Sequence, residues 1–345
     1  DLYGRFAFGI PPQKNGDYAF LLHILATLKS TGKGAVILPH GVLFRGGAEA
    51  VIRRNVVRHG FIKGIIGLPA NLFYGTGIPA CIIVLDKEHA AARKGIFMID
   101  ASKGFLKDGN KNRLRAQDIH RIVDTFTRQL EVPRYARMVP LAEISDPKND
   151  FNLNLPRYID STEPEDLQDI DGHLRGGIPD RDIDALQDYW KVLPSVRAML
   201  FRPLRPGYSQ LSTLSSQLKP AIFGHPEFTA FNETATRLFA RWSGTHFPGN
   251  AGLQPGMARK GTELELGAPG KTARAQLRAI AVGGKPKALI EKLSEDLLET
   301  FRKAPPIDAY DIYQHLMDYW AETMQDDVYL LVSDGWREAA KPRLI

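Results

Sequence analysis

IKGIIGLPANLFYGTGIPACIIVL, residues 62–85, decides the fold class. Two short apolar runs, 62–68 and 80–85, flank a loop that lies between Pro69 and Pro79. Apolar runs of this length, bounded by turn residues, are typical of strands that are buried on both faces of a sheet. The segment therefore predicts two buried strands joined by a glycine-containing loop.

The sequence on either side of this segment alternates between helix and strand patterns. Apolar residues at helical spacing predict helices over 17–30 and 48–58, and an apolar run predicts a strand over 35–38. A further strand is expected over 96–99 and a further helix over 116–129. Buried strands separated by amphipathic helices predict a three-layer α/β sheet, with an antiparallel pair at its edge because the last strands are joined by a short connection.

Changes in composition after residue 130 divide the rest of the chain. Residues 131–160 are interrupted by prolines and are expected to be a linker packed on the first domain, 1–130. Residues 161–242 and 288–345 are expected to be helical regions. Residues 243–287 are rich in Gly, Pro, Ala and basic residues, which predicts a flexible basic insertion. The helices expected within the two helical regions are 180–200, 209–223, 226–242, 288–302 and 308–323.

The amino-acid composition excludes several classes of protein. The chain of 345 residues is 43% hydrophobic and holds one cysteine, which excludes a disordered chain and a disulfide scaffold. No apolar run approaches the length of a membrane span, so a cytoplasmic protein without a membrane partner is expected.

Charge is unevenly distributed along the chain. Residues 1–130 hold 19 Lys or Arg and nine Asp or Glu, a net charge of +10, whereas 160–189 and 291–334 each carry −8. A basic first domain either attracts a polyanion such as DNA or is ordinary solvated surface. The acidic blocks are expected to face solvent or a basic protein partner.

Familiar catalytic motifs are missing from the sequence. It has no phosphate-binding glycine loop, no His-Glu-x-x-His pattern, no cysteine pair and no serine in a nucleophile elbow. Cys81 lies in an expected buried strand, which favours an inert core role. His40 follows the strand at 35–38, where α/β proteins place ligands, although a lone histidine there more often serves the fold.

Two loops follow expected strands at the ends where open sheets bind ligands. PHGVLFRGG, 39–47, and LPANLFYGTGIP, 68–79, combine glycine, aromatic and polar residues. Glycine permits close approach of the main chain, and exposed aromatic rings stack on flat ligands. The pattern favours a site for a planar ligand or nucleobase over tight structural turns.

These loops resemble the modification (M) subunits of type I restriction–modification systems, a family of N6-adenine DNA methyltransferases. The resemblance rests on GVLFRGGAEAVIRRN, 41–55, and GLPANLFYGTGIPACIIVL, 67–85. The other similar strings are DYAFLLH (17–23), IDASKGF (99–105), KNRL (111–114), NLNLPRYI (152–159) and IYQHLMDYWAETMQDDVY (312–329).

The resemblance implies transfer of a methyl group from S-adenosylmethionine to N6 of an adenine that is flipped out of duplex DNA. The family orients this base with an Asn-Pro-Pro-aromatic motif. That motif and the glycine-rich cofactor segment are absent from the sequence, and the nearest string is IPPQ, 10–13. Because the chain also begins at Asp1, the expected fold is the C-terminal half of a Rossmann-like methyltransferase sheet followed by a mainly helical extension. The chain is expected to be inactive alone, with no catalytic, metal-binding or cofactor-binding residue assigned.

The resemblance also implies a pocket for the target base. In related adenine methyltransferases an aromatic residue after the sixth strand closes this pocket. Phe73 is the candidate for that role, with Tyr74 second and Asn71 as a polar contact. The alternative for Phe73 is a loop anchor packed on the sheet.

The implied partners are macromolecules. Arg45, Arg53 and Arg54 are candidate contacts to the phosphates of double-stranded DNA, unless they form a solvated helix face. The specificity subunit is expected to bind the acidic C-terminal helices within 291–334. A restriction subunit and a complementing N-terminal chain are further expected partners.

Two other functions stay open at this point. The chain could be a non-catalytic component of the same complex that binds DNA or the specificity subunit. An Asn-Pro-Pro-aromatic chain encoded immediately upstream would favour the methyltransferase. An unrelated nucleotide-binding enzyme is the third interpretation, but it needs a phosphate loop that the sequence lacks.

Overall fold

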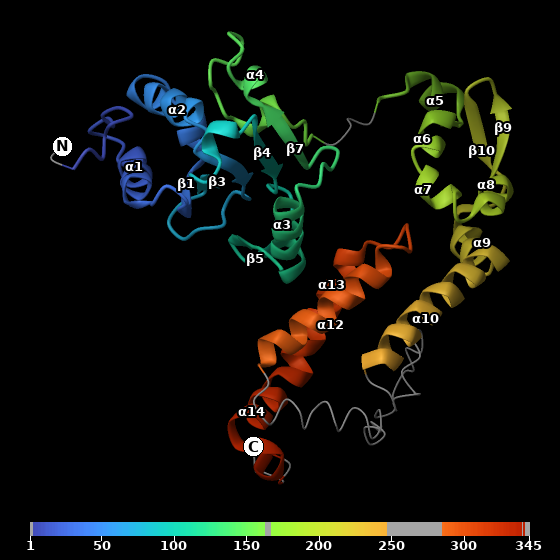
Figure 1. Cartoon of the computed structure of the whole chain (residues 1–345). Coiled ribbons are helices and arrows are strands. Elements are labelled where there is room, and N and C mark those ends of the chain that lie inside the picture. Colours follow the sequence, from blue (N-terminus) through green and yellow to red (C-terminus); the bar gives the residue numbers. More distant parts are fainter. Residues whose placement is uncertain (1–2, 163–166, 247–284, 340, 342–345) are drawn as a thin grey trace. The chain divides into compact units, whose positions relative to one another are not determined.

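A computed structural model describes residues 3–162, 167–246, 285–339 and 341 of the chain. These residues belong to two compact units, Asp1–Glu165 and Asp166–Ile345 (Figure 1). The flexible insertion expected at 243–287 lies for the most part outside the described residues.

The first unit is built on a five-stranded mixed sheet with the order β1-β3-β2-β4-β7. β2 is parallel to β4, whereas β3 is antiparallel to both β1 and β2, and β7 is antiparallel to β4. β1, β2 and β4 therefore run in one direction, and their carboxyl ends meet at one edge of the sheet. The strands are β1 (Lys33–Pro39), β2 (Ile62–Gly67), β3 (Ala80–Asp86), β4 (Gly95–Asp100) and β7 (Ala136–Pro140).

Helices cover both faces of this sheet, which confirms the predicted α/β class (Figure 1). α1 (Asp17–Thr27) and α2 (Ala48–Arg58) pack leucine, isoleucine and valine side chains on one face. α3 (Ala116–Arg128) packs Ile122 and Phe126 on the other. The period-two alternation of side chains along each strand supplies both cores. The strands β1 to β4 and the helices α1 to α3 lie where the sequence predicts them.

Residues 131–160 differ from the predicted linker. They contribute the edge strand β7 to the sheet, and Ile144, Phe151, Leu153 and Leu155 are buried in the first core. The prolines that suggested a linker end or border short elements here: Pro140 is the last residue of β7, and α4 (Leu141–Ile144) follows directly. A proline at the end of an edge strand removes no ladder hydrogen bond that the sheet needs.

Four short elements complete the first unit. They are the 3-10 turns η1 (His40–Leu43), η2 (Ala90–Ala92) and η3 (Leu155–Arg157), and the hairpin of β5 (Leu106–Asp108) and β6 (Lys111–Arg113).

The second unit is mainly helical, as predicted, but residues 161–242 are not helical throughout. It holds a three-stranded sheet with the order β8-β10-β9, and the strand β10 occupies the start of the helix expected at 209–223. A turn at Pro206-Gly207, with Gly207 at φ 77°, joins β9 to β10. Proline followed by a left-handed glycine is a strong turn signal, and here it overrides the helical spacing. The strands are β8 (Ile178–Pro179), β9 (Phe201–Arg205) and β10 (Tyr208–Leu211).

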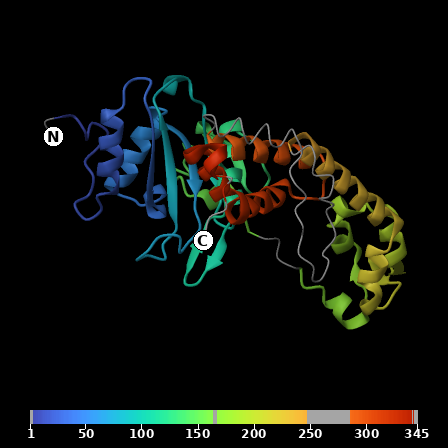
Figure 2. The same ribbon diagram turned by 90° about the horizontal axis from the view of Figure 1, so that it is seen from below.

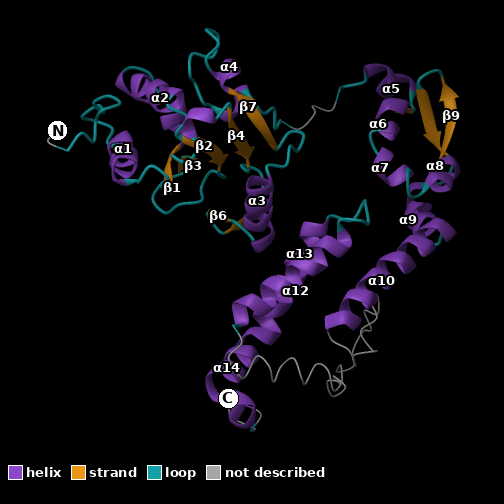
Figure 3. Ribbon diagram, in the orientation of Figure 1, coloured by secondary structure: helices purple, strands orange, loops and turns teal. Residues whose placement is uncertain are grey.

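Short helices lie beside this small sheet, and long helices follow it in the chain (Figure 3). The helix expected at 180–200 is divided into three pieces. The short helices are α5 (Ile170–Arg175), α6 (Asp180–Asp184), α7 (Gln187–Trp190), α8 (Pro194–Leu200), η4 (Ser215–Gln217) and α9 (Leu218–Phe223). The longer ones are α10 (Pro226–His246), α12 (Pro286–Phe301), α13 (Ala309–Tyr319), the π-helical turn η5 (Trp320–Met324) and α14 (Gln325–Ala339).

The long helices share a core of their own. Trp242 of α10 donates a hydrogen bond to the carbonyl oxygen of Leu293 in α12 at 3.3 Å. Ile290, Trp320 and Val328 are buried together, which joins α12 to η5 and α14. Within the described part of the chain, none of the helices has the length and apolarity required to cross a membrane.

Candidate functional site

The carboxyl edge of the first sheet brings together the two loops singled out in the sequence. β1 is followed by η1 and the loop to α2, and β2 is followed by the loop 68–79. The main-chain N–H of His40 donates to the carbonyl oxygen of Pro79 at 3.0 Å, so the two loops are directly joined. Open sheets bind ligands at this edge, because the strand ends leave a crevice between neighbouring loops.

The loop 68–79 presents two aromatic rings. Phe73 is 37% exposed and Tyr74 is 94% exposed. Asn71 has a left-handed backbone with φ 55°, and its N–H donates to the carbonyl oxygen of Gly77 at 3.3 Å. A Cβ on Gly77 would lie 3.0 Å from Oδ1 of Asn71, a contact tight enough to require a small shift of the Asn71 side chain. The three predicted pocket residues therefore share one loop, in which Asn71 also shapes the main chain.

Arg45 and Arg54 are half-exposed and each is paired with an acid. Arg45 contacts Asp17 at 2.8 Å and the buried Glu49 at 3.4 Å. Burial raises the pKa of the Glu49 carboxyl, and the Arg45 guanidinium opposes that shift. Arg54 pairs with Asp150 at 2.7 Å.

Arg53 is placed differently from the prediction of a DNA contact. Only 3% of it is exposed. Its guanidinium donates hydrogen bonds to the carbonyl oxygens of Phe151 at 2.8 Å, Val42 at 3.1 Å and Arg45 at 2.9 Å. These bonds join α2 to the loop after β1 and to the segment after β7. In this arrangement the guanidinium is committed to the fold rather than displayed to a phosphate.

A small polar cluster lies at the same edge of the sheet. Nε2 of His40 is buried and has no hydrogen-bond partner among the described residues, and burial lowers the pKa of its imidazole while Asp100 raises it. Asp100 ends β4 and is 8% exposed. It accepts hydrogen bonds from Oγ of Ser161 at 2.5 Å and from the N–H of Ser102 at 3.1 Å. The cluster offers hydrogen-bonding groups rather than ligands for an ion, and no group suited to a metal is found among the described side chains.

Two residues with no role predicted from the sequence hold the loop 68–79, the aromatic loop. Lys111 and Asn112, on β6, donate hydrogen bonds to carbonyl oxygens of residues 70–76. Figure 2 shows the hairpin projecting from the first unit beside this loop. The string KNRL, 111–114, is part of the resemblance to the methyltransferase family. Its residue types alone do not indicate a role in holding a loop.

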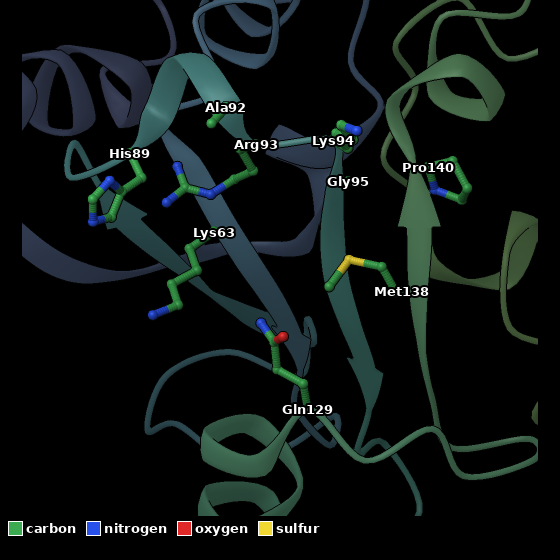
Figure 4. A pocket seen from close by; sticks show the side chains of 9 residues that line it. All are labelled: Lys63, His89, Ala92, Arg93, Lys94, Gly95, Gln129, Met138 and Pro140. Atoms are coloured by element: carbon green, nitrogen blue, oxygen red, sulfur yellow. The ribbon is translucent and has the colours of Figure 1, made fainter.

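A cavity of about 490 Å³ lies at the opposite edge of the sheet (Figure 4). Lys63 lies near the start of β2 and Gly95 starts β4, whereas Pro140 ends the antiparallel β7. The cavity therefore does not include the predicted site residues. Its lining is Lys63, His89, Ala92, Arg93, Lys94, Gly95, Gln129, Met138 and Pro140.

The sequence of the first unit matches the model of a known family. Residues 3–167 match the family model of N-6 DNA Methylase. The match covers the five-stranded sheet, its helices and the aromatic loop.

The particular relatives are methylase subunits of type I restriction enzymes. The chain is 34% identical over 170 residues to the MpnII methylase subunit of Mycoplasma pneumoniae, covering 49% of this chain and 31% of the relative. It is 36% identical over 175 residues to the MjaVII methylase subunit of Methanocaldococcus jannaschii, covering 49% of this chain and 29% of the relative. The predicted resemblance to this family is thereby confirmed, and the chain spans about a third of the length of these relatives.

Among solved structures, the methyltransferase subunit of a type I restriction-modification system from Streptococcus thermophilus is similar to this chain. The identity is 41%, with 45% of this chain and 33% of the other chain covered and a TM-score of 0.42.

Proposed function

We propose that this chain is part of an N6-adenine-specific DNA methyltransferase subunit of a restriction–modification system. The observation that carries the proposal is the loop with Phe73 and Tyr74, exposed at the carboxyl edge of a sheet whose sequence matches N-6 DNA methylases. A base flipped out of a duplex needs a flat apolar surface to replace its lost stacking, and an exposed aromatic ring supplies one. The proposed location of this activity is the cytoplasm.

The contribution of this chain is to position the base. The exocyclic amino group of adenine is a poor nucleophile, so its reaction depends on orientation and electrostatics rather than on a covalent intermediate. In the proposal Phe73 stacks on the flipped base, Tyr74 borders it and the side-chain amide of Asn71 contacts its polar edge. Arg45 and Arg54 contact the DNA backbone by exchanging a carboxylate partner for a phosphate.

S-adenosylmethionine is the proposed methyl donor of the complete enzyme. The described residues do not fit its site: β1 leads into the 3-10 turn η1 and β2 into the loop 68–79, so neither strand passes through a glycine-rich turn directly into a helix. We therefore assign no residue of this chain to the cofactor and derive no transfer step from it.

A complementing N-terminal chain is the proposed source of the missing groups. β1 pairs only with β3 among the described strands, so its other side is open. Ile37, in the middle of β1, is 53% exposed, and Phe20 of α1 is 69% exposed. Soluble proteins rarely leave apolar side chains on an open edge strand, because such an edge pairs with other strands. An added strand would extend the sheet from β1.

Methyl transfer on mixing tests this function. The purified chain is incubated with duplex DNA and labelled S-adenosylmethionine, alone and together with a chain that carries the Asn-Pro-Pro-aromatic motif and the specificity subunit. We expect label in DNA only in the complete mixture, located on adenine N6. Absence of transfer from a complete mixture, in which all chains are folded and associated, would contradict the proposal.

A non-catalytic role is the second candidate, and one observation favours it. Residues 291–334 hold 11 acidic and three basic residues, and they form the helices α12 to α14 of the second unit. This surface suits a basic protein partner, for which we propose the specificity subunit, with a restriction subunit joining the same complex. Binding of the specificity subunit with no methyl transfer in any mixture would establish this alternative.

A further inference from the structure

The hairpin β5–β6 makes four hydrogen bonds to the main chain of the aromatic loop. Nζ of Lys111 donates to the carbonyl oxygens of Phe73 at 2.7 Å and Thr76 at 3.2 Å. Asn112 donates its main-chain N–H to the carbonyl oxygen of Asn71 at 2.9 Å and its side-chain Nδ2 to that of Ala70 at 2.8 Å. All four acceptors are main-chain atoms, so these contacts fix the path of the loop whatever its side chains are.

The two donors act on different parts of the loop. Lys111 connects the two ends of the segment 73–76, which carries the exposed rings. Asn112 holds the stretch just before it, where Asn71 has a left-handed backbone that an isolated chain rarely adopts. Leu72, which lies between Asn71 and Phe73, packs on the core of the sheet. The loop is thus held at its base by Leu72 and Asn112 and at its tip by Lys111.

We propose that Lys111 and Asn112 are positioning residues that hold the loop 70–76 so that Phe73 and Tyr74 are presented to a flipped base. The inference rests on the proposed function only for the identity of the ligand. A loop that is already ordered loses less conformational entropy when a base binds, so its affinity is higher than that of a loop that must first be ordered.

The variants distinguish the effect of the hydrogen bonds on the loop from the effect of the positive charge of Lys111. Lys111→Met removes both bonds from Nζ, and Lys111→Arg keeps a cationic donor. Asn112→Ala removes the bond to the carbonyl oxygen of Ala70. Lys107→Met is the matched control, because Lys107 lies opposite Asn112 on the other strand of the same hairpin. Its exposed side chain has no hydrogen bond or ion pair with a described residue, and the substitution leaves the main-chain pairing of the two strands in place. Thermal unfolding of each variant verifies that the fold is retained.

Hydrogen exchange in the intact chain tests the positioning directly. We expect the peptide that covers 69–79 to exchange roughly fivefold to tenfold faster in Lys111→Met and Asn112→Ala. Lys111→Arg and Lys107→Met should match the wild type. Unchanged exchange in both Lys111→Met and Asn112→Ala, or an equal increase in Lys107→Met, would overturn the proposal.

Base binding tests the consequence of that order. The probe, added to the chain assembled with the complementing N-terminal chain, is a single-stranded oligonucleotide with one 2-aminopurine, a fluorescent adenine analogue that is quenched by stacking. We expect weaker quenching in Lys111→Met and restoration in Lys111→Arg, with Lys107→Met unaffected. Faster exchange with wild-type quenching would reduce the hairpin to a stabilising element and overturn the positioning role. No quenching by the wild type would instead refute the base pocket of the proposed function, and the exchange measurement would still decide whether the hairpin holds the loop.

Discussion

Among individual residues, Phe73 bears most directly on the proposed chemistry. A base–aromatic stack contributes about 1–3 kcal/mol to binding. Phe73→Ala in the complemented enzyme should therefore weaken base capture by roughly fivefold to 150-fold, with little change in stability because the ring is 37% exposed. Methylation kinetics at limiting DNA measure the effect, and Leu106→Ala, at an exposed apolar residue of the hairpin, is the control. Unchanged kinetics would assign Phe73 to loop packing.

Arg53 illustrates how a residue type can mislead. Its hydrogen bonds to the carbonyl oxygens of Phe151 and Val42 are buried, and the one to Arg45 is partly buried. Their loss takes this donor from all three oxygens, of which that of Val42 keeps the hydroxyl of Tyr18. Arg53→Met should lower the free energy of unfolding of the first unit by about 3 kcal/mol. Arg54→Met, next to it on α2 but half-exposed, should cost about 1 kcal/mol or less. Urea unfolding measures both, and similar small losses would show that Arg53 is dispensable to the fold.

His40 makes stability depend on pH. Burial lowers the pKa of its imidazole in the folded state, with Asp100 opposing the shift, so the unfolded chain binds the proton more readily. The stability that the neutral His40 side chain allows is fully present above the ordinary histidine pKa of about 6.5. It is lost as the pH falls through the lower pKa of the folded state, because protonation then favours the unfolded chain. Melting temperatures at pH 7.5 and pH 5 should therefore differ less in His40→Gln than in the wild type. An identical pH dependence in the two proteins would remove His40 as the cause.

At the scale of elements, the open side of β1 is the feature with a functional consequence. Ile37→Lys places a charge on that exposed edge, which should block addition of a strand while leaving the existing core intact. We expect complementation by the upstream chain to be lost, as measured by co-elution and by methyl transfer. Leu106→Lys, an exposed apolar residue on the hairpin, should complement normally. Complementation by Ile37→Lys at the wild-type level would place the partner elsewhere.

The elements also show where sequence reasoning succeeds and where it stops. Buried strands such as 80–85 were predictable because apolar runs between turn residues leave few other structures. The strand at 208–211 was missed because its register comes from pairing with β9 across the turn at Gly207, which helical spacing conceals. The aromatic loop could be located from the sequence because it follows a predicted strand. Its contacts with Lys111 could not be predicted, because the acceptors are main-chain oxygens, which every residue type carries.

Over the whole molecule, charge is divided between the two units. The first unit, 1–165, holds 23 basic and 16 acidic residues, whereas 166–345 holds 22 and 23. DNA affinity should therefore come from the first unit and fall steeply with salt, because phosphate contacts release bound counterions.

If Arg54 exchanges Asp150 for a phosphate, Arg54→Gln should reduce the slope of log K against log salt by about one. Arg197→Gln, which removes an exposed arginine from the second unit, should leave the slope unchanged. Equal slopes for wild type and Arg54→Gln would show that Arg54 keeps its carboxylate partner, and a reduced slope in Arg197→Gln would show that the second unit also contacts DNA.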